Sequence, residues 1–349
     1  MMTSDSGDFH DGVAAAIGDL KTNANNTLRT SGIERMTRRL GTTLLCCALA
    51  FGAPLEAAQT TFATPQAAVE AVVAAIKADR QASLLAMLGP HGERLLRSGD
   101  RVADEQNRAT FLKQYGAAHR ITLEGNSRAI LSIGSDDWPL PIPLVRSNDS
   151  TWRFDVAAGE QEVLARRIGR NELSAIQVSL AIVDAERDYS ARDIDRDGLR
   201  EYAARITSRH NRRDGLYWAN RPGEPASPLG PLLAAAAREG YGNPWRGALA
   251  PYHGYHYRIL SRQGKHAAGG AYHYVVKGKM LAGFALIAYP ARHGVSGIMS
   301  FVVNQDGLVY QKNLGPNTTA IASAYASYNP DQSWKRAAAP ERLSRSNQP

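Results

Sequence analysis

The chain has 349 residues, enough for two domains, and 44% of them are hydrophobic, which excludes long disorder away from the ends. Its 41 lysines and arginines exceed its 33 aspartates and glutamates, giving a net charge of +8 that favours anionic surroundings such as envelope polymers or lipid head groups. The basic residues are dispersed along the chain, so a solvated surface explains them and we expect no binding to nucleic acid.

A secretory signal peptide is indicated at residues 36–58, well inside the chain. It opens with a basic tetrapeptide, continues with apolar residues 40–53, which are too few to span a membrane, and ends in small residues suited to cleavage. Polar residues 1–35 would be unusual before such a signal, so we interpret them as a spurious N-terminal extension, with Met36 as the true start. The protein is therefore expected to be periplasmic or secreted, with no membrane span after signal cleavage.

Both cysteines, Cys46 and Cys47, fall inside this signal. The mature chain would then form no disulfides and offer no thiolate to a metal. An exported protein without disulfides must rely on its hydrophobic core, which a chain of this length permits.

Residues 59–158 are predicted to form an N-terminal α+β domain. Thr64 and Pro65 suit the N-cap and first turn of a helix, and two further helices follow before the pattern changes to that of strands. Helices followed by antiparallel strands are typical of α+β folds. The strands are expected at residues 119–123, 128–133, 140–146 and 151–156.

A long central helix is predicted over residues 168–189, which contain no proline. Asn171 is a usable N-cap. Alternatively, the helix runs unbroken from Gly159, with Gly169 as a weak point that costs ~1 kcal/mol. Its apolar residues form two stripes that point in nearly opposite directions, so we expect the helix to be covered on two sides. The stripes are Leu173, Ile176, Leu180, Val183 and Val178, Ile182, Ala185, Tyr189.

Residues 159–335 are predicted to form a second domain, in which this helix packs with an antiparallel sheet. An irregular region rich in glycine and proline follows the helix at residues 207–251. The polar tail, residues 336–349, is expected to be disordered. The expected fold class is therefore α+β, with N-terminal helices plus antiparallel sheet, a long central helix and a C-terminal antiparallel sheet. The later strands are expected at residues 255–261, 272–277, 284–289, 297–303 and 308–312.

Several phrases occur along the chain in an order and at intervals typical of one family. They are DDWPLPIPLV, IGRNELSAIQV, RDGLYW, SPLGPL, PYHGYHYRIL and GFALIAYPARHGVSGIMSFVVNQDGLVYQKNLG. Over residues 62–334 the chain resembles the exported bacterial family labelled domain of unknown function 2950. This resemblance implies a periplasmic or secreted protein and implies no particular activity.

The second half also resembles soluble type IV pilin-like modules. The phrases NELSAIQVSLAIVDAERDYSA, HGYHYRI and GFALIAYPARHGVSGIMSFVVNQDGLVY follow the order of a pilin helix and its antiparallel sheet. The hydrophobic N-terminal half of a pilin helix and its processing site are missing. The resemblance implies a soluble pilin-like module and no filament subunit.

An acidic loop after the central helix is a candidate calcium site. Asp193, Asp195 and Asp197 alternate before Gly198, and such carboxylates can converge on Ca²⁺, with Glu201 contributing through a water. The twelfth position, where an EF-hand has glutamate, is an alanine, so the loop is no EF-hand. The alternative is an acidic turn that only ends the helix.

Asp214, Trp218 and His253 are the candidate ligand-binding residues. Aromatic rings beside carboxylates in a loop can stack on a sugar ring and hydrogen-bond its hydroxyls, although buried loop anchors have the same composition. His253 and His256 are expected to point to opposite faces of a strand, which does not favour a shared metal.

The leading hypothesis is a non-enzymatic binding or scaffold module of the cell envelope, whose partner is an envelope protein or a glycan. The competing hypothesis is an enzyme acting on cell-wall or polysaccharide material, and a third is a calcium-dependent assembly factor. A pocket lined by Asp214, Trp218 and His253, with a carboxylate of raised pKa, would favour the enzyme.

Overall fold

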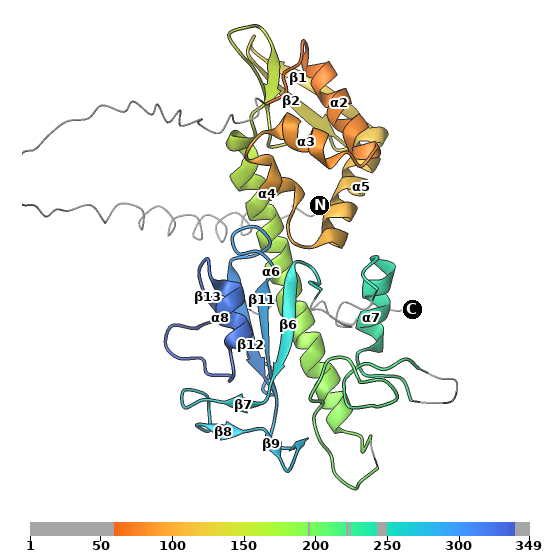
Figure 1. Ribbon diagram of the computed structural model, residues 1–349, viewed down its shortest axis with the longest axis vertical. Helices are drawn as coiled ribbons and strands as arrows, with labels where there is room; N and C mark the ends of the chain where they lie inside the picture. Colours follow the sequence, from red (N-terminus) through yellow and green to blue (C-terminus); the bar gives the residue numbers. More distant parts are fainter. Residues whose placement is uncertain (1–58, 195, 221–222, 224, 243–249, 339–349) are drawn as a thin grey trace, which may run out of the picture. The chain divides into compact units, whose positions relative to one another are not determined.

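A computed structural model describes residues 59–338 apart from residues 195, 221–222, 224 and 243–249 (Figure 1). The predicted extension, the predicted signal peptide and residues 339–349 of the predicted tail lie outside the described residues. In the described part the fold is α+β, as predicted, with seven helices and two five-stranded antiparallel sheets. None of the helices described is long and apolar enough to cross a membrane.

The chain enters the fold through the predicted first helix, α2 (Pro65–Lys77). The side chain of Thr64 accepts a hydrogen bond from the Ala67 N–H at 3.1 Å, which satisfies one of the free donors of the first turn. Three more helices follow, α3 (Gln81–Leu88), α4 (Gly92–Leu96) and α5 (Arg101–Ala117).

The first sheet comes next, and its strands run in the order β1-β2-β4-β5, with β3 paired to β2. The predicted strand at residues 140–146 is shorter than expected, because Pro141 and Pro143 have no N–H to donate to a neighbouring strand. The buried side of the sheet packs on α2 in one hydrophobic core. The strands are β1 (His119–Glu124), β2 (Arg128–Ile133), β3 (Trp138–Pro139), β4 (Leu144–Arg146) and β5 (Trp152–Phe154).

The long helix α6 (Val156–Ser190) has 35 residues and is unbroken, so the alternative prediction of a continuous helix is confirmed. Asp155 caps it by accepting a hydrogen bond from the Ala158 N–H at 3.3 Å. The expected N-cap, Asn171, instead lies inside the helix, where its amide donates to the Ser296 carbonyl at 2.9 Å. The helix starts earlier than expected because Asp155 and the residues after it support a first turn.

The two apolar stripes of α6 are mostly buried, as predicted. All four residues of the second stripe are buried, and so are Ile176 and Val183 of the first. Leu173 differs, because 44% of its surface is exposed. The buried residues from Ala175 onward belong to a second, larger core.

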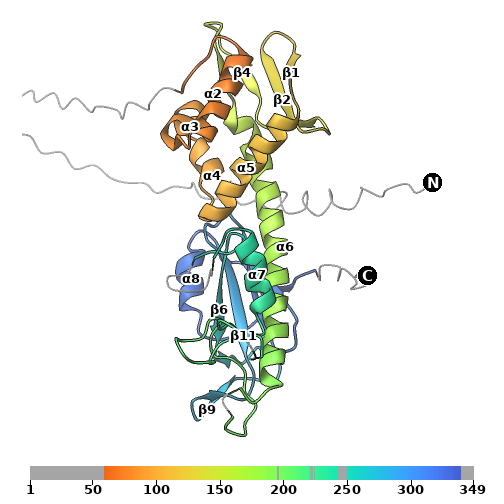
Figure 2. The ribbon, with the colours of Figure 1, turned by 90° about the vertical axis from the view of Figure 1, so that its right-hand side faces the viewer.

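The second sheet provides the rest of that core, with the strand order β14-β13-β12-β11-β6. Figure 2 shows α6 on one face of this sheet and α8 (Thr318–Ala324) on the other, and β11 is correspondingly buried along its whole length. Arg336 belongs to β14 and Ala337 is buried, so the chain stays ordered past residue 335. The strands are β6 (Tyr255–Leu260), β11 (Ala285–Pro290), β12 (Met299–Asn304), β13 (Tyr310–Asn313) and β14 (Lys335–Arg336).

The predicted strand at residues 272–277 is divided in two. Its first part, β8 (Tyr272–His273), pairs with β7 (Arg262–Gln263), and its second part, β9 (Val275–Val276), pairs with β10 (Lys279–Met280). The division falls at Tyr274, whose N–H donates to the Ser261 carbonyl at 2.9 Å.

Candidate binding site

The acidic loop after α6 is held by its own hydrogen bonds. The carboxylate of Asp193 accepts from the N–H groups of Asp197 and Gly198, at 3.1 and 2.9 Å. The ammonium of Lys279 forms ion pairs with Asp197 and with Glu201, the latter at 3.5 Å. Lysine therefore neutralises two of the predicted calcium ligands.

Asp195, the remaining predicted ligand, lies outside the described residues. The described residues contain no group of three or more His, Cys, Asp or Glu side chains placed to hold a metal ion. The predicted calcium site is thus untested, although the contacts of Asp193 and Lys279 argue against it.

Asp214 is engaged with Arg209 inside its own loop. The backbone N–H of Arg209 donates to Oδ1 at 2.9 Å, and its guanidinium Nε donates to Oδ2 at 2.5 Å. Partial burial alone would raise the pKa of Asp214, but these hydrogen bonds and the arginine charge outweigh it and lower the pKa. Asp214 therefore stays ionised at neutral pH.

Trp218 anchors the same loop in the core, with only 7% of its surface exposed. Its ring packs edge-on against Tyr189 of α6, with 6.5 Å between ring centroids, and the Arg213 guanidinium lies 5.6 Å from the ring centroid. The ring is thus covered, which agrees with the anchoring alternative and leaves little surface for a sugar to stack on.

His253 lies in a different cluster, in the turn before β6. Its Nε2 lies 3.2 Å from Oε2 of Glu239, the residue that ends α7 (Gly230–Arg238), and its ring packs against Tyr252 and Tyr241. Burial lowers the pKa of His253, against the opposing effect of the Glu239 and Asp100 charges.

The centre of this cluster is Asp100, which is 1% exposed. Its Oδ2 accepts hydrogen bonds from the Tyr241 hydroxyl and from the Gly254 N–H, both at 2.8 Å. Burial, followed by the charge of Asp100, raises the pKa of Tyr241. The Tyr241 hydroxyl therefore keeps its proton at neutral pH and acts as a hydrogen-bond donor to Asp100.

The structure does not bring the three predicted ligand-binding residues together. Trp218 packs on Tyr189 near the C-terminal end of α6, whereas Gly254, next to His253, lies against Asn171. These two positions on α6 are 189 − 171 = 18 residues apart, which corresponds to about 27 Å of helix. A single pocket lined by Asp214, Trp218 and His253 is therefore not formed.

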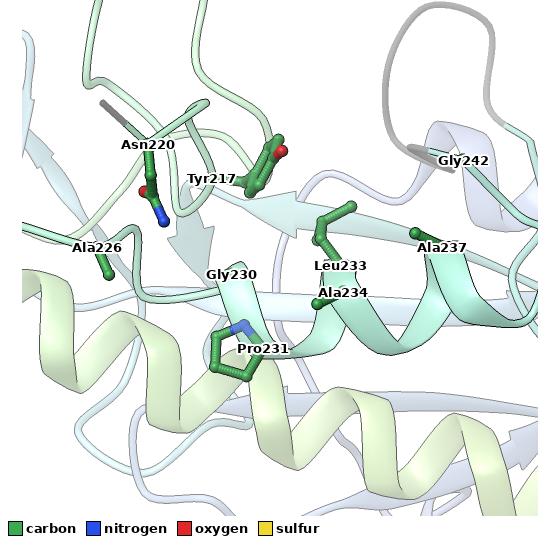
Figure 3. A pocket seen from close by; sticks show the side chains of 9 residues that line it. All are labelled: Tyr217, Asn220, Ala226, Gly230, Pro231, Leu233, Ala234, Ala237 and Gly242. Atoms are coloured by element: carbon green, nitrogen blue, oxygen red, sulfur yellow. The ribbon is translucent and has the colours of Figure 1, made fainter. Parts of the chain in front are cut away.

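A hollow of about 570 Å³ lies instead beside α7, within the predicted irregular region (Figure 3). Its size is within the range of small-molecule pockets. One wall is the face of α7, whose residues 230, 234 and 237 recur at the spacing of one helical face. The lining consists of Tyr217, Asn220, Ala226, Gly230, Pro231, Leu233, Ala234, Ala237 and Gly242.

Tyr217 and Asn220 form the polar part of this lining. Tyr217 is half-buried, and its ring stands above Leu233 in Figure 3. Oδ1 of Asn220 accepts a hydrogen bond from the Ser227 N–H at 2.9 Å, which orients the amide and leaves its NH₂ group directed toward α7. An aromatic ring and an oriented amide donor thus face a row of small apolar residues.

Sequence reasoning found the neighbourhood of this site but missed its members. Tyr217 lies within the segment from Asp214 to Trp218. Asp214 and Trp218 were predicted as ligand-binding residues instead, because a carboxylate and an indole are stronger chemical signals. In the structure the half-buried Tyr217 stands between the buried Leu216 and Trp218, so it is the more accessible of the two aromatic rings. Asn220 and α7 carried no comparable signal.

The fold and the hollow together define a two-core α+β protein organised on one long helix, with an open cavity beside a short helix. The family model described as Protein of unknown function (DUF2950) matches residues 59–337, and the chain belongs to this family. The family resemblance inferred from the phrases is thereby confirmed. No curated protein and no solved structure matches the chain.

Proposed function

We propose that the protein is an exported binding module of the bacterial cell envelope and that the hollow beside α7 binds a sugar unit of an envelope glycan. The observation that carries this proposal is the pairing of Tyr217 with Asn220 over the small residues of α7. The tyrosine ring can stack on the apolar face of a pyranose, and the amide can donate to a hydroxyl. The small side chains of Ala234 and Ala237 leave room for the ring.

Export is supported by the pattern of residues 36–58, a basic start followed by a short apolar stretch and small residues. The absence of cysteine after Cys47 suits an oxidising compartment, because no free thiol would be exposed there. Periplasmic or secreted location is part of the proposal.

The pilin-like character of the second half is also part of the proposal. It is supported by the way in which α6 packs on an antiparallel sheet. Oε1 of Glu172 on α6 accepts hydrogen bonds from the N–H groups of Ile298 and Met299, each at 2.9 Å, at the start of β12. In this reading the helix and sheet form a scaffold, and the loops after the helix provide the binding surface.

The test is a calorimetric titration of the protein with a soluble N-acetylglucosamine oligosaccharide and with a neutral glucose oligosaccharide as a second probe. We expect saturable binding to at least one of them. Tyr217→Ala should weaken it roughly 5- to 150-fold, if stacking of a sugar on the ring is worth about as much as the 1–3 kcal/mol of a base on an aromatic ring. Tyr217→Phe should keep most of the affinity, since it keeps the ring.

The matched control is Tyr115→Ala, which removes another half-buried tyrosine, on α5 in the first core. Equal losses for Tyr217→Ala and Tyr115→Ala would place the ligand away from the hollow. Saturable binding that Tyr217→Ala leaves unchanged would likewise contradict the proposed site. Binding to an envelope protein and to neither glycan would favour the scaffold alternative.

An enzyme acting on the same material is the second candidate. The observation that favours it is the His253–Glu239 pair at the C-terminal end of α7, two residues beyond Ala237. A histidine with a lowered pKa can act as a general base at neutral pH. Release of soluble sugar from isolated cell-wall material, lost on His253→Ala, would establish this activity.

A further inference from the structure

Two short hairpins form a lobe next to the second sheet, residues 261–281, which we call the hairpin lobe (Figure 1). It is firmly held, because Tyr274 between the hairpins is fully buried and its hydroxyl donates to Oε1 of Gln263 at 2.9 Å. The amide of Gln263 in turn donates to the carbonyls of Ala268 and Gly270, at 2.6 and 2.7 Å. The lobe therefore presents a fixed surface.

The tip of the lobe exposes two apolar side chains in succession. Val275 is 37% exposed and Val276 is 44% exposed. Successive residues of a strand point to opposite sides, so both sides of this tip face solvent.

A third exposed apolar residue is attached to the lobe. Leu199, 45% exposed, lies in the loop after α6. That loop is joined to β10 by the hydrogen bond from the Tyr202 N–H to the Met280 carbonyl, at 2.8 Å, and by the ion pair between Lys279 and Glu201. The loop that carries Leu199 is therefore attached to the lobe that carries Val275 and Val276.

The charge on the lobe itself has one sign, whereas the loop that carries Leu199 contains Asp193, Asp197 and Glu201 beside Arg196 and Arg200. Residues 240–305 contain no aspartate or glutamate, and the lobe itself carries four lysines and arginines. Lys279 is paired with Asp197 and Glu201, whereas Lys265 and Lys277 are exposed. The four basic residues are Arg262, Lys265, Lys277 and Lys279.

We propose that the hairpin lobe, with Leu199, docks on the surface of an anionic phospholipid bilayer. Val275 and Val276, exposed at a tip with lysines around them, are suited to a membrane interface, where the apolar groups enter the headgroup region and the cations meet lipid phosphates. A hydrophilic polyanion would use the lysines but gain nothing from Val275 and Val276. The surface shares no residue with the hollow beside α7, and the proposal does not rest on the proposed function.

The test is co-sedimentation with phosphatidylcholine vesicles that contain or lack phosphatidylglycerol. It uses the full chain and, in parallel, a chain beginning at Gln59, because Gln59–Pro349 forms one compact unit. The shorter chain lacks the apolar residues 40–53, which could bind vesicles by themselves. We expect both chains to bind the anionic vesicles and the shorter chain to bind neutral vesicles poorly.

Two variants separate the apolar and charged contributions. The double variant Val275→Ser/Val276→Ser should reduce binding by the shorter chain at least tenfold, because it removes the inserting groups. Lys277→Glu changes the local charge by two units and should weaken binding roughly 25-fold, at roughly fivefold for each charge. The matched controls are Leu308→Ser/Ile321→Ser and Lys335→Glu, which change exposed residues outside the lobe and should bind like the unaltered chain.

Absence of binding by the shorter chain to anionic vesicles would overturn the proposal. Binding that the double valine variant leaves unchanged, and that soluble heparin abolishes, would also overturn it and point to a hydrophilic polyanion. Equal losses in the lobe variants and in their controls would show that the lobe has no special role. Each variant's thermal unfolding curve shows whether it is folded, and only folded variants are compared.

Discussion

The Tyr241 hydroxyl donates a 2.8 Å hydrogen bond to Oδ2 of Asp100, a residue 141 positions earlier in the chain. The same carboxylate accepts from the Gly254 N–H, and its Oδ1 accepts from the Ala103 N–H at 3.1 Å, which caps α5. One buried side chain thus joins the start of α5 to the residues that follow α7 and precede β6.

Replacing Asp100 with alanine should lower the free energy of unfolding by about 3–5 kcal/mol. The change removes a helix cap, worth about 1 kcal/mol, and leaves the buried Tyr241 hydroxyl and Gly254 N–H without their acceptor. Tyr241→Phe removes one of these hydrogen bonds and should cost about 1–2 kcal/mol. Urea unfolding curves measure both. A loss below ~1 kcal/mol for Asp100→Ala would show that the network contributes little.

Glycines 159 and 169 of α6 should respond in opposite ways to alanine. A Cβ on Gly159 would lie 2.2 Å from the Pro141 carbonyl oxygen, whereas a Cβ on Gly169 has nothing within 4 Å. Gly169→Ala should therefore stabilise the protein by about 0.5–1 kcal/mol through helix propensity. Gly159→Ala should destabilise it by about 1–3 kcal/mol, because the overlap outweighs the same gain. Melting temperatures that move in the same direction would contradict the packing of α6 against residues 141–142.

Glu186 should make the protein less stable as the pH rises. It is completely buried, and burial raises its pKa well above the ordinary value, against one hydrogen bond from the Ala203 N–H at 2.8 Å. The folded state then keeps its proton while the unfolded state loses it above a pKa of about 4.3. The free energy of unfolding should fall by about 1.4 kcal/mol per pH unit between the unfolded and the folded pKa.

Glu186→Gln removes the carboxyl group that titrates. The free energy of unfolding of this variant, relative to that of the unaltered protein, should therefore increase from acidic to neutral pH. Glu162→Gln, at a half-exposed position on the same helix, is the matched control variant. Unfolding curves recorded at several pH values provide the comparison. A stability difference for Glu186→Gln that is the same at every pH would show that Glu186 is ionised in the folded protein.

Calcium should leave the melting temperature of the protein unchanged. The Asp193 carboxylate is occupied by backbone N–H groups, and Lys279 already supplies a positive charge to Asp197 and Glu201. A calcium ion that bound only the folded state would raise the free energy of unfolding by about 2.7 kcal/mol at a hundredfold excess over its Kd. A calcium-dependent rise that disappears in Asp193→Asn would establish the predicted calcium site and the assembly hypothesis that depends on it.

Much of the fold could be predicted because its signals are local. The strand predicted at residues 128–133 and the Thr64-Pro65 helix start each depend on neighbours in the chain, and both elements occur where expected. The first prediction for the central helix, residues 168–189, was too short, and the alternative of a continuous helix was the better one, because Gly169 does not interrupt α6. The helix-propensity cost of Gly169 is ~1 kcal/mol. This cost is smaller than the free energy gained by burying residues such as Ile176 and Ile182.

The sites were harder to predict because they depend on long-range contacts. Nothing near Asp100 in the chain indicates that Tyr241 will be its partner. The hollow arises only where Tyr217 meets a helix that begins thirteen residues later, at Gly230. The anchoring alternative for Asp214 and Trp218 was within reach of the sequence, because Asp214 bonds to Arg209 of its own loop and the Trp218 ring packs on Tyr189 beneath it.

The most direct test of the proposed site is an NMR titration of the protein that begins at Gln59 with the N-acetylglucosamine oligosaccharide. We expect the amide signals of Gly230, Ala234 and Ala237, together with the side-chain NH₂ of Asn220, to shift progressively and saturate, while those around Asp100 stay unchanged. Shifts confined to residues around His253 and Glu239 would move the site to the second cluster. Saturable binding with no shift along α7 would contradict the claim that the hollow is a glycan site.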